Sequence, residues 1–366
     1  MTSFGNTISR AVVLVALMAA GNLAVAKRSA VLQSAGPIAF APGGVLVAAD
    51  PKAATLVAME TGDTKAAGGG AIKIERVDRK IASVLGATAD AIRIVDLAVN
   101  PVSHNAYLSV ARGRGADATA VIVRIDGSGD IDVFEFDPKK VSHVVLPNAP
   151  EDRVTGQGRR ARNQRLESIT DLSYVDGNII VAGLSNEEFA STLRSIPFPF
   201  ESVGEGSSIE IYHGAHGRYE TRSPIRTFVP YSIDGESHIL AAYTCTPLVK
   251  VPVAQLKPGA HVKGTTIAEL GNRNRPLDMV VYSKSGKDWF LMANSSRGVM
   301  KISTDNLADA PSIISRVEGG GVKGQPYETI KSWPEIFQLA QLDEDYALVL
   351  RGNADGALDL ESLQYP

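Results

Sequence analysis

The sequence is poor in cysteine, in tryptophan and in long apolar runs. Its single cysteine, Cys245, has no second cysteine to pair with, so no internal disulfide can form. The six histidines lack the spacing of a metalloprotease, and the absence of a Cys-x-x-Cys-His motif excludes covalently attached haem. A chain of 366 residues can bury enough apolar surface without such crosslinks. The sequence therefore predicts a large fold held together by its own core.

The one long apolar run lies near the N-terminus. Arg10 precedes the apolar residues 11–20, and the small residues Ala24 and Ala26 follow a short break. This is the pattern of a secretory signal peptide, and the run is too short to cross about 30 Å of hydrocarbon. We expect residues 1–26 to be cleaved off after Ala26, leaving a periplasmic or secreted protein without a membrane span. An uncleaved membrane anchor is the alternative.

The charge of the chain argues against nucleic acid and anionic lipid as partners. The formal net charge is −3, and removal of Arg10 with the signal peptide changes it to −4. A mildly acidic protein carries no global electrostatic footprint for either partner. The longest insertion, 151–165, nevertheless contains five arginines: Arg153, Arg159, Arg160, Arg162 and Arg165. These could capture an anionic ligand, or they could belong to a solvated loop.

A strand–turn–strand unit recurs six times along the chain. Each unit has a very apolar strand, a polar turn and a shorter strand, as in 179–186 followed by 192–196. Helical periodicity is nearly absent outside residues 79–91. A parallel β-helix would repeat at about 20 to 30 residues, which is shorter than the spacing here. The pattern predicts an all-β fold, a six-bladed β-propeller of four-stranded antiparallel blades, over a sandwich or a β-helix.

The repeats assign the mature chain, 27–366, to one propeller domain. The predicted blades span 36–78, 95–137, 168–213, 226–271, 276–318 and 334–366. The sixth unit reaches the C-terminus without a fourth strand. We therefore expect an N-terminal strand at 29–34 to complete it and to close the ring.

Propeller topology predicts which residues meet at the mouth of the central channel. The starts of the first strands, the ends of the second strands and all the long connections share one face, where function is expected. The first strands would contribute Asp96, Asp171, Asp278 and Glu335. The ends of the second strands would contribute a ligand-binding set: Arg112, Asn186, Tyr243, Asn294 and Arg351, with Cys245 close by.

Four carboxylates near one axis repel one another unless something compensates their charge. A divalent cation such as Ca²⁺ would suit these oxygen ligands. Ion pairs of Asp96 and Glu335 with Arg112 and Arg351 would serve equally well. Hydrogen bonds to the neighbouring blade are a third way to hold a polar residue at this position. The sequence leaves these readings open.

The arrangement resembles the six-bladed propellers of the gluconolactonase and NHL-repeat type over the whole mature chain. In the lactonase-like members an ion sits at the channel mouth, and the resemblance implies these ligand positions: Asp50, Asp96, Asp171, Asn186, Asp278, Asn294 and Glu335. The segment 57–62 is also faintly similar to the repeat of pyrroloquinoline-quinone propellers. Those repeats carry a docking tryptophan in each blade, whereas this chain has only Trp289 and Trp333. We therefore expect no bound quinone.

Two smaller groups have both a functional and a structural interpretation. His213 and His216 could chelate a metal from a turn, but a solvated loop is the favoured reading. Cys245 could be a nucleophile or a soft-metal ligand, but a partly buried structural thiol is favoured.

Two functions of different class follow from these features. The first is an exported propeller that binds a small molecule or a periplasmic protein on its loop-rich face. The second is a metal-dependent, lactonase-like hydrolase in which a cation polarises a carbonyl group. Because a fold alone does not license a reaction, the sequence favours the binding function.

Overall fold

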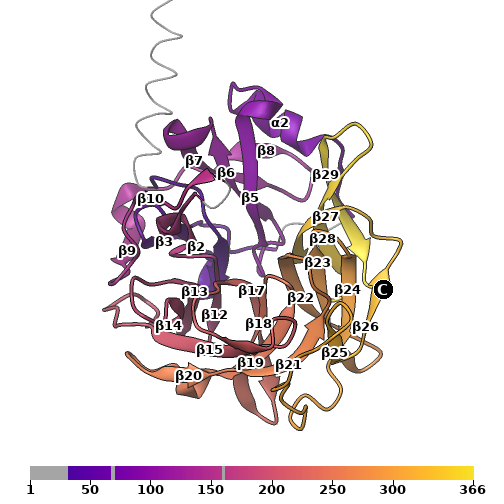
Figure 1. Ribbon diagram of the computed structural model, residues 1–366. Helices are drawn as coiled ribbons and strands as arrows, with labels where there is room; N and C mark the ends of the chain where they lie inside the picture. The colour runs from indigo at the N-terminus through magenta and orange to yellow at the C-terminus, as the bar shows by residue number, and fades with distance from the viewer. Residues whose placement is uncertain (1–31, 67–70, 159–160) are drawn as a thin grey trace, which may run out of the picture.

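The computed structural model describes residues 32–66, 71–158 and 161–366, and it shows a six-bladed β-propeller (Figure 1). The described part is nearly all β-structure, with a single α-helix, α2 (Val77–Val84). This confirms the fold class predicted from the repeats. The signal-peptide prediction, 1–26, lies outside the described residues.

Blades are numbered here by the order of their first strands in the sequence. Blades 3, 4 and 5 take their four main strands in chain order, and blade 6 takes its first three strands in the same way. Blade 3 contains β12 (Asp171–Val175), β13 (Asn178–Leu184), β14 (Ser191–Pro197) and β15 (Ser207–His213), with β16 (Arg218–Glu220) and β20 (His261–Lys263) added at its edge. Blade 4 contains β17 (Ile225–Ile233), β18 (Glu236–Tyr243), β19 (Pro247–Pro252) and β21 (Thr265–Leu270), with β25 (Val322–Gly324) at its edge.

Blades 5 and 6 complete this consecutive set. Blade 5 contains β22 (Pro276–Lys284), β23 (Lys287–Asn294), β24 (Gly298–Ser303) and β26 (Tyr327–Ile330). Blade 6 contains β27 (Ile336–Gln341), β28 (Tyr346–Gly352) and β29 (Leu358–Gln364), and its fourth strand comes from elsewhere in the chain. The fourth strand of blade 5 therefore lies at 327–330, beyond residue 318, where the sequence pattern ended this blade.

Blades 1 and 2 are interleaved in sequence. Blade 2 contains β5 (Ile92–Val99), β6 (Ala106–Arg112), β7 (Thr119–Ile125) and β8 (Ile131–Val133). Blade 1 contains β1 (Ile38–Ala41), β2 (Val45–Asp50) and β3 (Thr55–Glu60), and its outer strand is β9 (Val141–Val145). The chain thus leaves blade 1 unfinished, builds blade 2, and returns to complete blade 1.

The order of the blades around the ring differs from their order in the sequence. The inner strand β1 contacts both β12 and β5, and β5 in turn contacts β27. Blade 2 therefore lies between blades 6 and 1, so that the ring reads 1, 3, 4, 5, 6, 2. Six separate apolar clusters fill the six blade-to-blade junctions that this order creates. No repeat pattern could have shown this order, because every blade has the same strand signature.

The ring closes through β4 (Lys73–Ile74), which pairs with β29 as the outer strand of blade 6. The Ile72 backbone adds to this pairing, since its N–H donates to Ser362 Oγ at 2.6 Å and its carbonyl accepts from Ser362 N at 2.8 Å. Closure by a strand from the N-terminal part of the chain is thus confirmed. The segment predicted for it was wrong: residues 32–34 lie outside any strand, and 29–31 lie outside the described residues.

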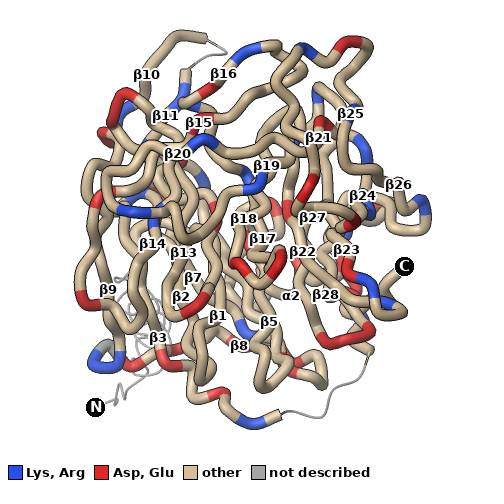
Figure 2. Tube along the Cα trace, turned by 90° about the horizontal axis from the view of Figure 1, so that it is seen from below, with Lys and Arg blue, Asp and Glu red and all other residues tan. Residues whose placement is uncertain are grey.

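The helix α2 covers the junction of blades 2 and 6, one of the two junctions at which the ring order departs from the sequence order. Its buried side chains, Val77 and Ile81, belong to one apolar cluster with residues of β5, β6, β28 and β29. This places the helix across blades 2 and 6, directly after the closing strand. In the view of Figure 2, basic and acidic positions are interspersed along the chain.

Candidate functional site

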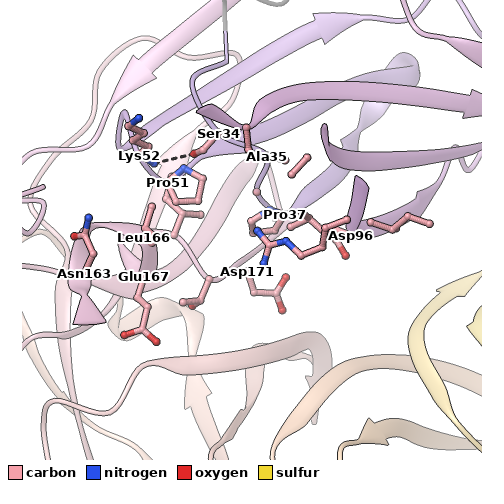
Figure 3. Close-up of a pocket in the computed structure, with 18 of the residues that line it drawn as sticks. Ser34, Ala35, Pro37, Pro51, Lys52, Asp96, Asn163, Leu166, Glu167 and Asp171 are labelled. Atoms are coloured by element: carbon pink, nitrogen blue, oxygen red, sulfur yellow. Dashed lines mark hydrogen bonds between the residues drawn. The ribbon is translucent and has the colours of Figure 1, made fainter. Parts of the chain in front are cut away.

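A cavity of about 1140 Å³ opens at the mouth of the central channel (Figure 3). It lies on the face predicted to carry function, because its wall is formed by the starts of the inner strands and by the connections that lead into them. All six blades contribute to it. A cavity of this size is large enough for a small organic molecule or cofactor.

Three aspartates form the floor of this cavity: Asp96, Asp171 and Asp278. The same three also line a smaller chamber of about 320 Å³ that continues down the channel between the inner strands. They occupy equivalent positions on β5, β12 and β22, opposite Ser109, Ala182 and Ala293. The other three blades have Pro37, Thr227 and Gln338 at this level. In the spatial order of the blades the aspartates alternate with these residues, which gives the floor a pseudo-threefold symmetry.

Each aspartate ties its blade to the next one around the ring. Asp171 Oδ2 accepts from the backbone N–H of Phe228 in blade 4 at 2.8 Å. Asp278 Oδ2 accepts from Leu339 N in blade 6 at 2.7 Å, and Asp96 Oδ2 accepts from Ile38 N in blade 1 at 2.7 Å. The three bonds run in the same rotational direction. The sequence left open whether a cation, an ion pair or a hydrogen bond to the neighbouring blade holds these carboxyls. The structure shows the hydrogen bond.

The floor carboxyls hold their protons more strongly than ordinary aspartates do. Burial, reinforced by the nearby Asp171, raises the pKa of Asp96 to about 8. Burial also raises the pKa of Asp171 to about 7, although two backbone N–H donors oppose the shift. The pKa of Asp278 is raised too, by burial and by the charges of the other two carboxyls. The floor is therefore largely neutral in mildly acidic solution, because like charges in one desolvated channel disfavour ionisation.

The three carboxyls do not gather into a ready cation site. Among the residues that the structure describes, only one set of three or more His, Cys, Asp or Glu side chains has its ligand atoms within 4.8 Å of one another, and it lies elsewhere. Glu335, the fourth predicted ligand, is not among the residues lining either chamber. In blade 6, the residue that lines the cavity at the level of the three aspartates is Gln338.

Positive charge gathers on the cavity wall above the floor. Five cationic residues line it: Lys52, Arg93, Arg114, Arg226 and Arg275. Arg226 sits in a β-bulge of β17 and pairs with Glu167 at 2.8 Å. Arg114 pairs with Asp90 at 2.8 Å. Arg226 and Arg275 both line the cavity, and burial and the charge of Arg226 lower the pKa of Arg275.

The long insertion between β9 of blade 1 and β12 of blade 3 covers one side of the mouth. It contains the short hairpin of β10 (Val154–Thr155) and β11 (Arg162–Asn163), and it contributes Asp152, Val154, Asn163, Leu166 and Glu167 to the wall. Figure 3 shows Glu167 and Asn163 on this side of the cavity and Asp96 and Asp171 deeper inside it. The described arginines of the insertion, 153, 162 and 165, do not line the cavity.

The insertion is held down where it rejoins the propeller. A Cβ at position 183 would lie 2.0 Å from the Ser168 carbonyl oxygen, so this contact requires Gly183. The Ser168 hydroxyl donates to the Pro51 carbonyl at 2.8 Å. These contacts fix Glu167 and the residues before it against the wall.

The predicted second-strand residues lie away from the mouth. None of the six lines the cavity: Arg112, Asn186, Tyr243, Cys245, Asn294 and Arg351. Tyr243 is buried, Asn294 accepts from the Asn274 side chain at 3.0 Å, and Arg351 pairs with Glu361 in its own blade. The physical reason is that second strands stand one strand further from the axis, and the connections into the first strands cover their ends.

Sequence reasoning missed the cationic wall. Arg93, Arg226 and Arg275 each stand one to three residues before the mouth position of their blade. This recurrence in three of six repeats was a usable signal. It was obscured because a bulge near each arginine, at residues 95, 226 and 277, shifts the register of the first strand.

Comparisons with known proteins add little to this geometry. No protein-family model matches the chain, and no curated protein matches it in sequence. Among solved structures, a glucose dehydrogenase is 10% identical, with a TM-score of 0.36 and 92% and 97% of the two chains covered. A soluble aldose sugar dehydrogenase from Escherichia coli is 11% identical, with a TM-score of 0.31 and coverage of 91% and 97%. Because these identities and TM-scores are low, the fold assignment rests on the sheet topology of this chain alone.

One of these comparisons corrects an expectation drawn from the sequence. The PQQ-bound form of an aldose sugar dehydrogenase from Streptomyces coelicolor is 12% identical, with a TM-score of 0.26 and coverage of 90% and 94%. The expectation of no bound quinone is therefore corrected, because a structure with bound PQQ is among those to which this chain is similar. The gluconolactonase and NHL-repeat part of the resemblance receives no specific support.

Proposed function

We propose that this propeller binds a small anionic molecule in the mouth cavity. The observation that carries the proposal is the charge of the cavity lining, where five cationic side chains face three wall carboxylates, Asp90, Asp152 and Glu167. The floor adds little negative charge while its carboxyls hold their protons. In a confined, partly desolvated space, guanidinium groups favour carboxylate or phosphate ligands through paired hydrogen bonds.

Arg275 and Arg226 are the residues we expect to contact the anion. Arg226 is held by Glu167 and by Thr244, whose hydroxyl accepts from its Nε at 3.2 Å. A fixed guanidinium loses little conformational freedom when it binds a ligand. The mutual repulsion of the two arginines in the free protein would be relieved by a negative charge between them.

The experiment compares molecules of similar size and different charge. Isothermal titration calorimetry at pH 6 would use gluconate, citrate, glucose 6-phosphate and pyrroloquinoline quinone, which carries three carboxylates, with glucose as the neutral reference. We expect at least one anion to bind at least 10-fold more tightly than glucose. We expect Arg275→Gln to weaken that binding about 10-fold, which corresponds to about 1.4 kcal/mol.

Arg162→Gln is the matched control, because Arg162 is an exposed arginine of the insertion that does not line the cavity. Its affinity should equal that of the wild type. Binding should also weaken as the pH rises from 6 to 9, because ionisation of the floor adds negative charge beneath the ligand. Equal affinity for glucose and every anion, or equal losses in the two arginine variants, would contradict the proposal.

A metal-dependent hydrolase is not our proposal. The oxygens of Asp96, Asp171 and Asp278 already accept backbone N–H groups, and the three carboxyls are not brought together around one point. Both features favour a binding site over a cation centre at the mouth.

We also propose that the protein works in the periplasm after cleavage behind Ala26. The support is the signal-peptide pattern of residues 1–26. Among the described residues, no helix is long and apolar enough to cross a membrane. N-terminal sequencing of the protein from a periplasmic extract should begin at Lys27, whereas an intact N-terminus in the membrane fraction would contradict this proposal.

A further inference from the structure

Two histidines and the single cysteine meet at the junction of blades 3 and 4. His213 ends β15, His216 lies in the turn to β16, and Cys245 lies in the turn between β18 and β19. One ligand atom of each residue lies within 4.8 Å of the others, and this is the one such set among the residues that the structure describes. None of the three lines the mouth cavity.

A carboxylate behind the histidines orients both rings. Glu220 Oε2 lies 3.0 Å from His213 Nδ1, and Glu220 Oε1 lies 2.6 Å from His216 Nδ1. Because a neutral imidazole that donates from Nδ1 has a free lone pair on Nε2, this arrangement directs both Nε2 atoms away from Glu220 as acceptors. A carboxylate on the second ring nitrogen is the usual support of a metal-binding histidine.

The buried nitrogen of His213 lacks a partner. The His213 side chain is only 3% exposed, and its Nε2 makes no hydrogen bond with any described residue. A buried polar atom without a partner is costly, so such an atom in a native structure points to a ligand. Close to the same turn, Glu269 Oε1 accepts from Gly214 N at 2.5 Å, while Glu269 Oε2 is also buried without a partner.

The backbone around Cys245 is strained and firmly anchored. Cys245 and Thr246 adopt φ values of 65° and 58°, in the left-handed region that side chains other than glycine and asparagine disfavour. Cys245 N donates to the Asn274 carbonyl at 2.7 Å, and Thr246 Oγ1 donates to the Gly271 carbonyl at 2.7 Å. Strain that is held in this way is typical of functional positions, because the surrounding contacts preserve it.

We propose that His213, His216 and Cys245 bind a zinc ion through the two Nε2 atoms and the thiolate. Two imidazoles and one thiolate are a ligand set that Zn²⁺ prefers, and three protein ligands leave a fourth position open. Binding converts the Cys245 thiol to a thiolate and releases one proton to the solvent. His216 has 43% of its side chain exposed, so an ion can reach the site from solution.

The geometry requires only a small adjustment. Ligand atoms around one tetrahedral zinc ion stand about 3.3 to 3.5 Å apart, as Zn–N distances of about 2.0 Å and a Zn–S distance of about 2.3 Å require. The three ligand atoms, within 4.8 Å of one another, must therefore approach by at most about 1.5 Å. His216 is on an exposed turn and can supply most of this movement. The ion would then link blade 3 to blade 4.

In the test, the purified full chain is first stripped of metal with a chelator. It is then titrated with ZnCl₂ in the presence of a chromogenic chelator that competes for the zinc ion. We expect one equivalent of Zn²⁺ to bind and the melting temperature to rise with excess zinc, because the ion binds the folded state. Substituted Co²⁺ should give a thiolate-to-cobalt charge-transfer band in the near-ultraviolet. That band reports on coordination by Cys245 directly.

Three variants and one control make the assignment specific. Cys245→Ser and His216→Asn should lose stoichiometric zinc binding, and Cys245→Ser should also lose the charge-transfer band. Glu220→Gln should weaken zinc binding about 10- to 100-fold, since it supports the ligands without touching the ion. His143→Asn, at an exposed histidine of β9 in blade 1, should bind zinc as the wild type does.

The proposal would be overturned by a wild type that binds no zinc in the presence of the competitor. It would equally be overturned by stoichiometric binding that Cys245→Ser and His216→Asn leave unchanged. Far-ultraviolet circular dichroism of each variant shows whether the fold is retained, and a weakened site in a folded Glu220→Gln protein supports the proposal even where another variant fails to fold.

Discussion

At the scale of single residues, the three floor aspartates are the best-defined feature of the channel. Each accepts a backbone N–H from the blade ahead of it, so its first effect is to fix the relative position of two blades. The carboxylate of Asp50, at the end of β2, links two segments of the chain in a similar way. Its Oδ1 accepts from Ser34 Oγ at 2.7 Å and from Ala53 N at 3.0 Å, which ties the segment before β1 to the end of β2.

We expect Asp171→Asn to lower the free energy of unfolding by about 1 to 3 kcal/mol. An asparagine presents one acceptor and one donor where two N–H groups, those of Leu172 and Phe228, now point at two oxygens. One buried donor is then left unsatisfied, which has a cost of this size. Urea denaturation measures the change. Asp309→Asn, at an exposed position, is the control, and equal behaviour of the two variants would show that the bond to blade 4 has no effect on stability.

At the scale of elements, the closing strand β4 matters more than its length suggests. It has only two residues, yet it provides the outer edge of blade 6 and leads directly into α2. Ile74 is 5% exposed and belongs to the apolar cluster between blades 2 and 6. The strand and the helix together cover the junction of blades 6 and 2, one of the two junctions at which chain order and ring order disagree.

Ile74→Ala should therefore destabilise the protein by about 2 to 4 kcal/mol, through lost burial and a cavity between the two blades. Hydrogen–deuterium exchange should rise in β29, its pairing partner, before it rises in the other blades. Lys73→Ala removes an exposed side chain of the same strand and should change neither measurement. If both variants left exchange in β29 at the wild-type level, closure through β4 would be contradicted.

At the scale of the whole molecule, the stability of the ring depends on whether the three aspartates that line the channel are protonated. The folded state keeps protons on Asp96, Asp171 and Asp278 at pH values where the unfolded chain has released them. Stability is therefore greatest below about pH 4, as far as these groups are concerned, and declines as the pH rises towards about 8. The contribution of Glu220 to stability depends on pH in the opposite direction. Burial would raise its pKa, but hydrogen bonds to His213 and His216 outweigh this effect and lower it, so its stabilising contribution is lost only in more acidic solution.

Chemical denaturation between pH 5 and pH 8, with a chelator present to remove any bound metal, should show this decline. We expect the free energy of unfolding to fall throughout this range, by at most about 1.4 kcal/mol per pH unit for each carboxyl that stays protonated only in the folded state. Asp278→Asn should show a shallower decline, because it removes one titrating group and one like charge from the other two. A free energy that stays constant or rises with pH would contradict the assignment of a neutral floor.

The sequence alone was enough for the fold class, because strand alternation and turn residues are local signals that repeat in each blade. It also predicted the face on which the mouth cavity opens and three of the floor residues, since antiparallel topology fixes which strand ends share a face. The second-strand residues and Glu335 were placed at the mouth on the same logic, and the structure puts them elsewhere. Bulges and covering loops decide which side chains reach a cavity, and neither has a distinct local pattern.

What only the tertiary structure decided is the order of the blades and everything that depends on it. Ring position is set by which apolar faces pack together, and six blades with the same kind of apolar face give no local sign of their neighbours. From that order follow the closing strand at 73–74, the alternation of the three aspartates, and the meeting of His213, His216 and Cys245 across two blades. Contacts between residues far apart in sequence create these features, so no single segment contains them.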